Sequence, residues 1–86
     1  MVVKIEEILY TSRFEHEVKK IKDRGVKIEI EKRIRKILLN PEIGKPLSYT
    51  LKGERTVRIT PYRLIYTIDE KKVIQLRLEH RKEVYK

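Results

Sequence analysis

The spacing of apolar residues changes near the middle of the chain, and this change constrains the fold more than any other feature. Between residues 12 and 39, apolar residues recur every three or four positions, which predicts helices with one apolar face. Beyond residue 54 they alternate with polar residues in short runs, which predicts strands joined as hairpins. Helices followed by such strands are typical of an α+β domain with a largely antiparallel sheet.

The N-terminal half predicts one strand and two helices. Residues 3–10 are rich in apolar and β-branched side chains and predict the strand. Ser12, followed three positions later by Glu15, predicts the start of the first helix as a capping box. Residues 23–25 interrupt the helical pattern, and a second helix is expected over residues 27–39, ended by an Asn-Pro pair. Because their connection is short, the helices should form an antiparallel hairpin packed on the sheet.

A loop over residues 40–50 separates the helices from the remaining strands. These strands are expected over residues 55–60, 63–69 and 73–79, which gives the order β-α-α-β-β-β. Alternation assigns two sets of side chains to the two sides of the last strand. The core side should carry Ile74, Leu76 and Leu78, and the opposite side Gln75, Arg77 and Glu79.

Length and residue usage exclude several kinds of protein. At 86 residues, the chain is expected to form one domain, residues 1–86. It has no cysteine and only two histidines, so disulfides are excluded and no metal or cofactor is expected. No apolar run approaches the roughly 18 residues of a membrane span. Glu6 and Glu7 interrupt the apolar N-terminus, so no signal peptide is expected and the protein should be soluble and cytoplasmic.

The positive charge is concentrated in the second half of the chain. The net charge is +9, and residues 44–86 hold 11 Lys/Arg against 5 Asp/Glu, whereas residues 1–43 hold 11 against 8. A charge of this size attracts polyanions, and arginine forks bind phosphate well. The alternative is a charge that only keeps the protein soluble. Its concentration in the strand region favours an anion-binding surface there.

Arg58 and Arg63 are the first candidates for binding a phosphate. Val57 and Ile59 should lie on one face of their strand and Arg58 on the other. Two guanidinium groups on neighbouring strands can hold the non-bridging oxygens of one phosphate and neutralise charge that develops on phosphorus. The alternative is that these arginines are solvated or paired with nearby carboxylates, either Glu54 or Glu79.

His80, directly after the last strand, is a candidate for proton transfer. Its ordinary pKa of about 6.5 suits acid–base chemistry at neutral pH. The alternative follows from alternation, which also places His80 on the core side as a rim residue.

Six further residues complete the candidate site. Tyr85 could stack on a base or fix the C-terminus, Arg81 and Lys82 extend the basic cluster, and Lys52 and Arg55 flank a glycine in a basic turn. Arg77 is expected on the outer side of the last strand. Lys52, Arg55, Arg77 and Lys82 are therefore predicted to contact RNA.

The chain resembles the RelE/ParE superfamily of toxins from toxin–antitoxin modules. The resemblance covers nearly the whole length and rests on motifs that are weak alone and specific in combination. In chain order these are Ser12–Phe14, Ile37–Pro41, Gly44–Leu47, Leu51–Gly53, Val57–Ile59, Tyr62–Tyr66 and His80–Tyr85.

The resemblance implies a microbial-RNase-like α+β fold and, in the RelE branch, metal-free cleavage of messenger RNA in the ribosomal A site. The 2′-hydroxyl of the RNA attacks the adjacent phosphate and releases a 5′-hydroxyl. A cognate acidic antitoxin, the ribosome and mRNA are the implied partners. The ParE branch shares the fold but poisons DNA gyrase. A catalytically inactive RNA- or ribosome-binding protein is a further alternative.

The motifs also imply roles for individual residues. Arg63 matches the arginine that stabilises the transition state, and Arg58 matches a basic strand residue. Arg81 matches a C-terminal arginine of the archaeal pattern, Tyr85 the terminal tyrosine, and His80 lies where several relatives have a catalytic histidine. Two positions depart from the best-studied type of these toxins. Thr56 stands where that type has a second strand lysine, and Glu79 stands near the place where it has another arginine.

Overall fold

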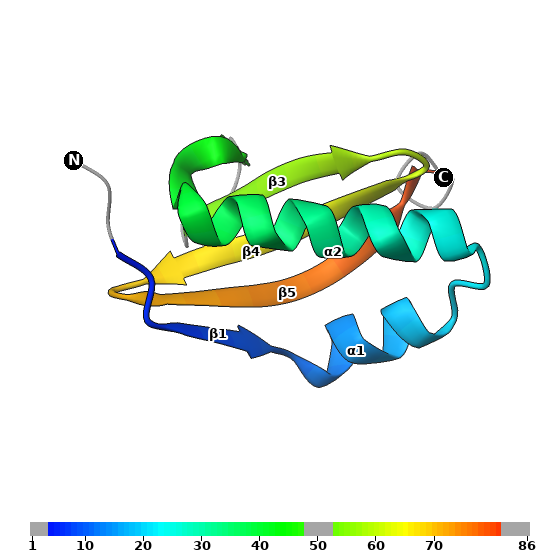
Figure 1. Cartoon of the computed structure of the whole chain (residues 1–86), viewed down its shortest axis with the longest axis horizontal. Coiled ribbons are helices and arrows are strands. Elements are labelled where there is room, and N and C mark those ends of the chain that lie inside the picture. Colours follow the sequence, from blue (N-terminus) through cyan, green and yellow to red (C-terminus); the bar gives the residue numbers. More distant parts are fainter. Residues whose placement is uncertain (1–3, 48–52, 82–86) are drawn as a thin grey trace.

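Both helices pack on one face of a five-stranded sheet (Figure 1). The computed structural model describes residues 4–47 and 53–81. Its elements are β1 (Glu7–Tyr10), α1 (Ser12–Lys19), α2 (Arg24–Leu39), the 3-10 helix η1 (Pro41–Ile43), β2 (Lys45–Pro46), β3 (Glu54–Ile59), β4 (Tyr62–Asp69) and β5 (Lys72–His80). The strand order is β1-β5-β4-β3-β2, with β1 parallel to β5 and the other neighbours antiparallel. The predicted α+β class with a largely antiparallel sheet is confirmed.

We call the face of the sheet that packs against the helices the inner face, and the opposite one the outer face. The buried core on the inner side consists of Phe14, Ile21, Ile30, Ile34, Ile37, Val57, Ile59, Leu64, Tyr66, Val73 and Leu78. Arg58, between two buried residues of β3, is exposed on the outer face, as alternation predicts. Neither helix of the described chain has the length and apolar character needed to cross a membrane.

The first helix begins at Ser12 as predicted, but the residues that cap the two helices are not those that the sequence pattern identified. Thr11, not Ser12, caps α1, because its Oγ1 accepts a hydrogen bond of 3.0 Å from the Phe14 amide. Asp23 caps α2 and accepts from the Val26 amide at 3.2 Å. Residues 23–25 therefore start the second helix, which begins three positions earlier than predicted. The expected strand over residues 3–10 is also shorter, because β1 begins at residue 7.

The predicted alternation of β5 is wrong in its first half because the strand contains a β-bulge. Ile65 pairs with Arg77 and Tyr66 pairs with Gln75, so Leu76 is an extra residue on β5. An extra residue reverses the side-chain pattern on one side of it. Val73 and Gln75 are consequently fully buried on the inner face, whereas the predicted core residues Ile74 and Leu76 are only half-buried. Beyond the bulge, Leu78 is buried and Arg77 and Glu79 lie outside, as predicted.

The segment from Thr11 to Glu17 completes the edge of β5, because β1 ends at Tyr10. The Thr11 amide donates to the Gln75 carbonyl at 3.1 Å, and the Thr11 hydroxyl donates to the Leu76 carbonyl at 2.5 Å. Further along, the Glu17 carboxylate accepts from the Leu78 amide at 2.9 Å. A helix side chain thus supplies a partner that a neighbouring strand would otherwise provide.

The predicted loop over residues 40–50 contains η1 and the short strand β2, which the Tyr66 hydroxyl fixes to the sheet. This buried hydroxyl donates to the Pro41 carbonyl at 2.6 Å and accepts from the Gly44 amide at 3.0 Å. A Cβ atom on Gly44 would lie 2.7 Å from the same hydroxyl, so only glycine allows this approach. Arg55 reinforces the loop by donating to the Gly44 carbonyl at 2.7 Å.

Replacing Tyr66 with Phe should lower the free energy of unfolding by about 1–3 kcal/mol, because two buried backbone groups lose their partner. Burial raises the pKa of the Tyr66 hydroxyl above its ordinary value. Above a pH of about 10, tyrosine ionises in the unfolded chain while folded Tyr66 keeps its proton, so the wild type loses stability there and the variant does not. Urea unfolding from pH 7 to 11 should show that the difference in free energy of unfolding between the wild type and Tyr66→Phe narrows with rising pH. A difference that stays constant over this pH range contradicts the role given to the Tyr66 hydroxyl. Tyr10→Phe, at an exposed ring, is the control.

Replacing Glu17 with Ala should also destabilise the fold by about 1–3 kcal/mol, because the Leu78 amide loses its acceptor. Glu17→Gln keeps an acceptor oxygen at the same place and should retain most of the stability. Thermal or urea unfolding of both variants at neutral pH measures the difference. Equal losses would mean that the charge of Glu17, rather than this hydrogen bond, stabilises the helix against β5.

Candidate functional site

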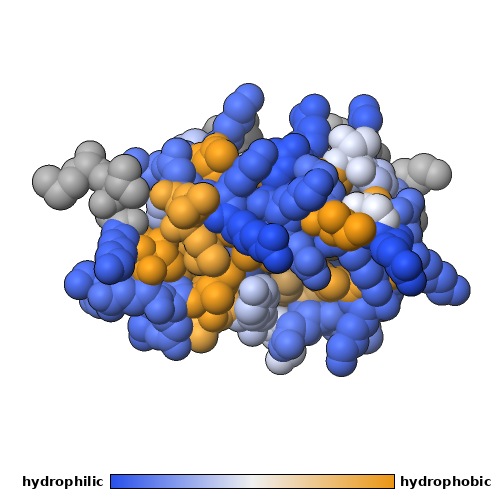
Figure 2. Space-filling model, viewed as in Figure 1, coloured by the Kyte–Doolittle hydropathy of each residue, from blue (hydrophilic) through white to orange (hydrophobic). Residues whose placement is uncertain are grey.

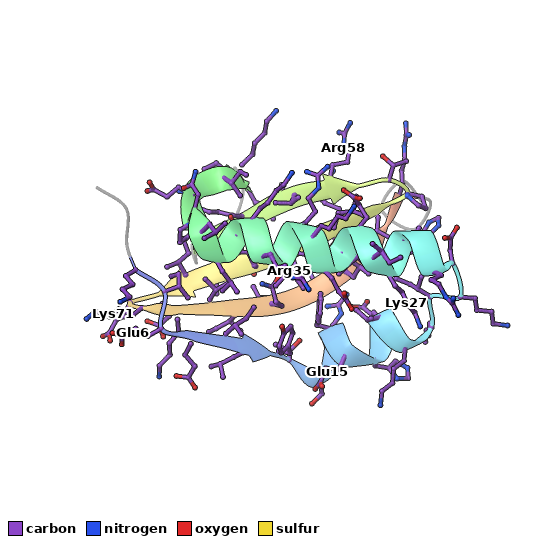
Figure 3. The ribbon with its side chains drawn as sticks, viewed as in Figure 1. Glu6, Glu15, Lys27, Arg35, Arg58 and Lys71 are labelled. Carbon is purple, nitrogen blue, oxygen red and sulfur yellow. The ribbon has the colours of Figure 1, made fainter. Side chains whose placement is uncertain are left out.

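Arg58 and Arg63 are direct cross-strand partners on the outer face of the β3–β4 hairpin. Side chains in this relation start about 5 Å apart, so both guanidinium groups can reach one anion. Arg58 is exposed and projects from β3 on the side of the molecule away from α1 (Figure 3). Among residues 4–47 and 53–81, neither arginine takes part in an ion pair. Like charges directly opposite each other repel, and a bound anion would remove that repulsion.

An open groove runs beside this arginine pair, along the edge of the sheet. It is lined by both arginines, by Glu29 and Arg33 of α2, and by Lys45 of β2. The groove exists because β2 is short and pairs only with residues 55 and 56 of β3. Beyond these residues no strand of the described chain lies on this side of β3, and the space between its edge and α2 stays open. The groove is open to solvent rather than enclosed, and its lining combines Arg58, Arg63 and Lys45 with the carboxylate of Asp23 and the Arg33–Glu29 ion pair.

Arg77 lies on the outer face, but two carboxylates occupy its guanidinium group. Its Nη2 and Nη1 atoms donate to Oε1 and Oε2 of Glu54 at 3.0 and 3.3 Å, and its Nε donates to Oε2 of Glu79 at 3.0 Å. The hydrogen bonds to Glu54 raise the pKa of Arg77 above its already high ordinary value, so the group stays charged. The predicted role of Arg77 as an RNA contact does not fit these pairings, because the charge is already neutralised inside the protein.

Pairing of Arg58 and Arg63 with Glu54 or Glu79 was the alternative to phosphate binding, and both of these carboxylates form ion pairs with Arg77. Glu79 nevertheless lies next to the arginine pair, because its backbone partner across the β4–β5 hairpin is Arg63. The outer face thus carries a short row of charged side chains that runs from Arg58 through Arg63 to Glu79.

His80 lies on the inner face, away from this row. Its strand partner is Tyr62, and the two rings meet edge to face with centroids 5.0 Å apart. A small pocket beside the ring is lined by Glu17 and Lys20 of the α1 region. The structure does not bring His80 together with Arg58 and Arg63, and its position is the rim position that alternation predicts.

Arg81 follows at the same end of the sheet as the arginine pair. Its amide donates to the Pro61 carbonyl at 2.9 Å, and Pro61 belongs to the turn between the strands that carry Arg58 and Arg63. The Arg81 side chain is exposed. This exposed third arginine is therefore anchored through its backbone beside the turn that joins the first two.

The remaining predicted site residues separate into two groups. Lys52, Lys82 and Tyr85 lie outside the described residues, so their predicted roles stay predictions. Arg55 belongs to the inner face and donates to the carbonyls of Glu42 and Gly44, so the structure gives it a role within the fold, and its predicted contact with RNA stays a prediction. No group of His, Asp or Glu side chains suited to a metal ion occurs within the described part of the chain.

Comparison with known proteins identifies similar toxins. The family model for the ParE toxin of the type II toxin–antitoxin system parDE matches residues 8–85. Among solved structures, the RelBE2 toxin–antitoxin complex from Mycobacterium tuberculosis contains a chain with 29% identity and a TM-score of 0.72, over 87% of this chain and 96% of that one. No curated protein matches the chain.

Two further structures share the fold at lower identity. The RelB–RelE complex from Methanococcus jannaschii has 20% identity and a TM-score of 0.74, covering 90% of this chain and 94% of that chain. The YoeB dimer from Staphylococcus aureus has 21% identity and a TM-score of 0.75, covering 90% and 97%.

If the arginine pair binds phosphate, Arg63→Ala and Arg58→Ala should each weaken the binding of a short single-stranded RNA. Each should also lower the slope of log K against log salt by roughly 0.7, the value for one lost phosphate contact. Arg35→Ala is the matched control, since this arginine is exposed on α2 (Figure 3) and should change the slope little. Fluorescence anisotropy over a series of NaCl concentrations measures both quantities. An equal change in all three variants would show that binding follows net charge alone.

Proposed function

We propose an activity for this chain, which belongs to the family of ParE toxins of type II toxin–antitoxin systems: it cleaves messenger RNA on the ribosome. As a toxin of the RelE/ParE superfamily, the protein has a fold shared by toxins with different targets. The choice between those targets therefore depends on the side chains of the site and not on the fold.

The observation that supports this proposal is the arginine pair on the outer face. Arg58 and Arg63 face each other across two strands, and neither is paired with a carboxylate in the described chain. In the proposed reaction the 2′-oxygen of a nucleotide forms a bond to the adjacent phosphorus and the bond to the 5′-oxygen breaks. Charge builds up on the non-bridging oxygens during this step, and two fixed guanidinium groups would stabilise it.

The other residues contribute around this pair. Arg81, held beside the β3–β4 turn, would contact the leaving group or ribosomal RNA, and Tyr85 would stack on the cleaved nucleotide. His80 lies on the inner face of the sheet, so groups on the outer face would carry out proton transfer. A domain of this size has little surface with which to read a sequence, and the ribosome would present the unstacked codon.

The expected partner is a cognate acidic antitoxin, which would bind the protein in the cytoplasm. The similar structures from M. tuberculosis and M. jannaschii are toxin–antitoxin complexes, and the net charge of +9 suits an acidic partner. The surface also exposes apolar side chains that a partner could cover, namely Leu39, which is 78% exposed, and Ile43, which is 48% exposed. Figure 2 shows apolar surface over β1 and the C-terminal part of α2.

Inhibition of DNA gyrase is the second candidate function. The matching family model describes ParE toxins, and the two carboxylates around Arg77 reduce the number of free cations on the outer face. In that case the protein would bind its target and perform no chemistry. A protein that binds RNA or the ribosome without cutting is the remaining alternative.

Purified protein should cut mRNA on programmed ribosomes in a buffer that contains EDTA, and should leave DNA supercoiling by gyrase unaffected. Arg63→Ala should lower the cleavage rate by roughly 10²–10³, the usual cost of removing one donor to a developing anion. Arg35→Ala should cut at the wild-type rate. Folded protein that inhibits gyrase and leaves mRNA intact would replace this proposal with the second one.

A further inference from the structure

The proposed cleavage requires a group that takes the proton of the attacking 2′-hydroxyl. This group must lie within hydrogen-bond reach of the nucleophile, and therefore on the same face as the phosphate-binding arginines. Arginine cannot accept a proton at neutral pH. The described residues of the outer face provide two carboxylates that meet at Arg77, those of Glu54 and Glu79. Of these, Glu79 is the cross-strand partner of Arg63, whereas Glu54 pairs with Thr67 further along β4.

The two carboxylates differ in what their oxygens already bind. Both oxygens of Glu54 accept from Arg77, at 3.0 and 3.3 Å, and its side chain is 12% exposed. Glu79 is 26% exposed, and within the described chain only its Oε2 accepts a hydrogen bond. Oε1 of Glu79 therefore remains available beside Arg63, its cross-strand partner.

We infer that Glu79 is the general base of the proposed reaction, with Arg77 as its positioning residue. The inference rests on the proposed function. Glu79 would take the proton from the 2′-oxygen as that oxygen bonds to phosphorus. The bond from phosphorus to the 5′-oxygen then breaks, the leaving oxygen takes a proton from water, and a 2′,3′-cyclic phosphate and a 5′-hydroxyl result.

Arg77 explains why Glu79 and Arg63 do not neutralise each other. Side chains directly opposite on antiparallel strands are close enough for an ion pair, yet Glu79 bonds to Arg77 on its own strand. Arg77 is itself fixed by the two-pronged contact with Glu54 on β3. This chain of contacts holds Glu79 in one orientation, and Arg63 stays free of carboxylates in the described chain.

A competing role for Glu79 predicts the opposite result. If the carboxylate only repels the phosphate, its removal should strengthen RNA binding and speed up cleavage. If Glu79 is the base, its removal slows the chemical step even where RNA binds as well or better. Glu79→Gln separates the two roles, because the amide keeps an acceptor for Arg77 but cannot take the proton.

The experiment measures single-turnover cleavage of mRNA on programmed ribosomes, together with RNA affinity, for the wild type and Glu79→Gln. The rate should fall roughly 10²–10⁴-fold with affinity unchanged or tighter, and the acidic limb of the pH–rate profile should disappear. Glu31→Gln, at an exposed position of α2, removes the same charge and should behave as wild type. A Glu79→Gln rate equal to or above that of the wild type overturns the assignment. If the wild type itself cuts no RNA, the proposed function fails, and this inference fails with it.

Arg77→Met tests the positioning role. The variant should fold, cleave more slowly and show a displaced acidic limb, because Glu79 is released toward Arg63. Loss of rate with an unchanged pH profile would mean that Arg77 acts only on stability, and would remove it from the proposal.

Discussion

One extra residue in β5, Leu76, determines which side chains each face of the sheet presents. Without this bulge, strict alternation from the buried Val73 would turn Arg77 and Glu79 toward the core and His80 outward. The bulge reverses that arrangement for the second half of the strand. Thr11 binds the backbone carbonyls at this point, so the start of α1 and the irregularity of the strand stabilise each other. The charged row on the outer face depends on this local geometry.

The elements that the sequence predicted correctly are those in which one periodic pattern runs through the whole segment. In β3, the buried pair Val57 and Ile59 identifies the face of Arg58 without further information. For these segments local pattern and tertiary packing agree, which is the usual condition for a reliable prediction. The position of Arg63 opposite Arg58, in contrast, depends on the register of the β3–β4 hairpin, which the sequence pattern left open.

The errors have a common physical origin in contacts between distant segments. A bulge leaves no composition signal at Leu76, so alternation alone assigned Gln75 to the wrong face. The partner of Arg77 depends on strand order, since Glu54 lies two strands away on β3. The separation of His80 from the arginines is likewise a result of register. The sequence therefore indicated the residue types of the site, whereas the sheet determined which of them meet.

The buried amide of Gln75 has a consequence for how this protein can change. Its side chain is fully buried, and neither its oxygen nor its nitrogen has a hydrogen-bond partner in the described part of the chain. Such a group costs free energy that an apolar side chain of similar length would not. The domain is consequently less stable than the same fold with an apolar side chain in place of Gln75.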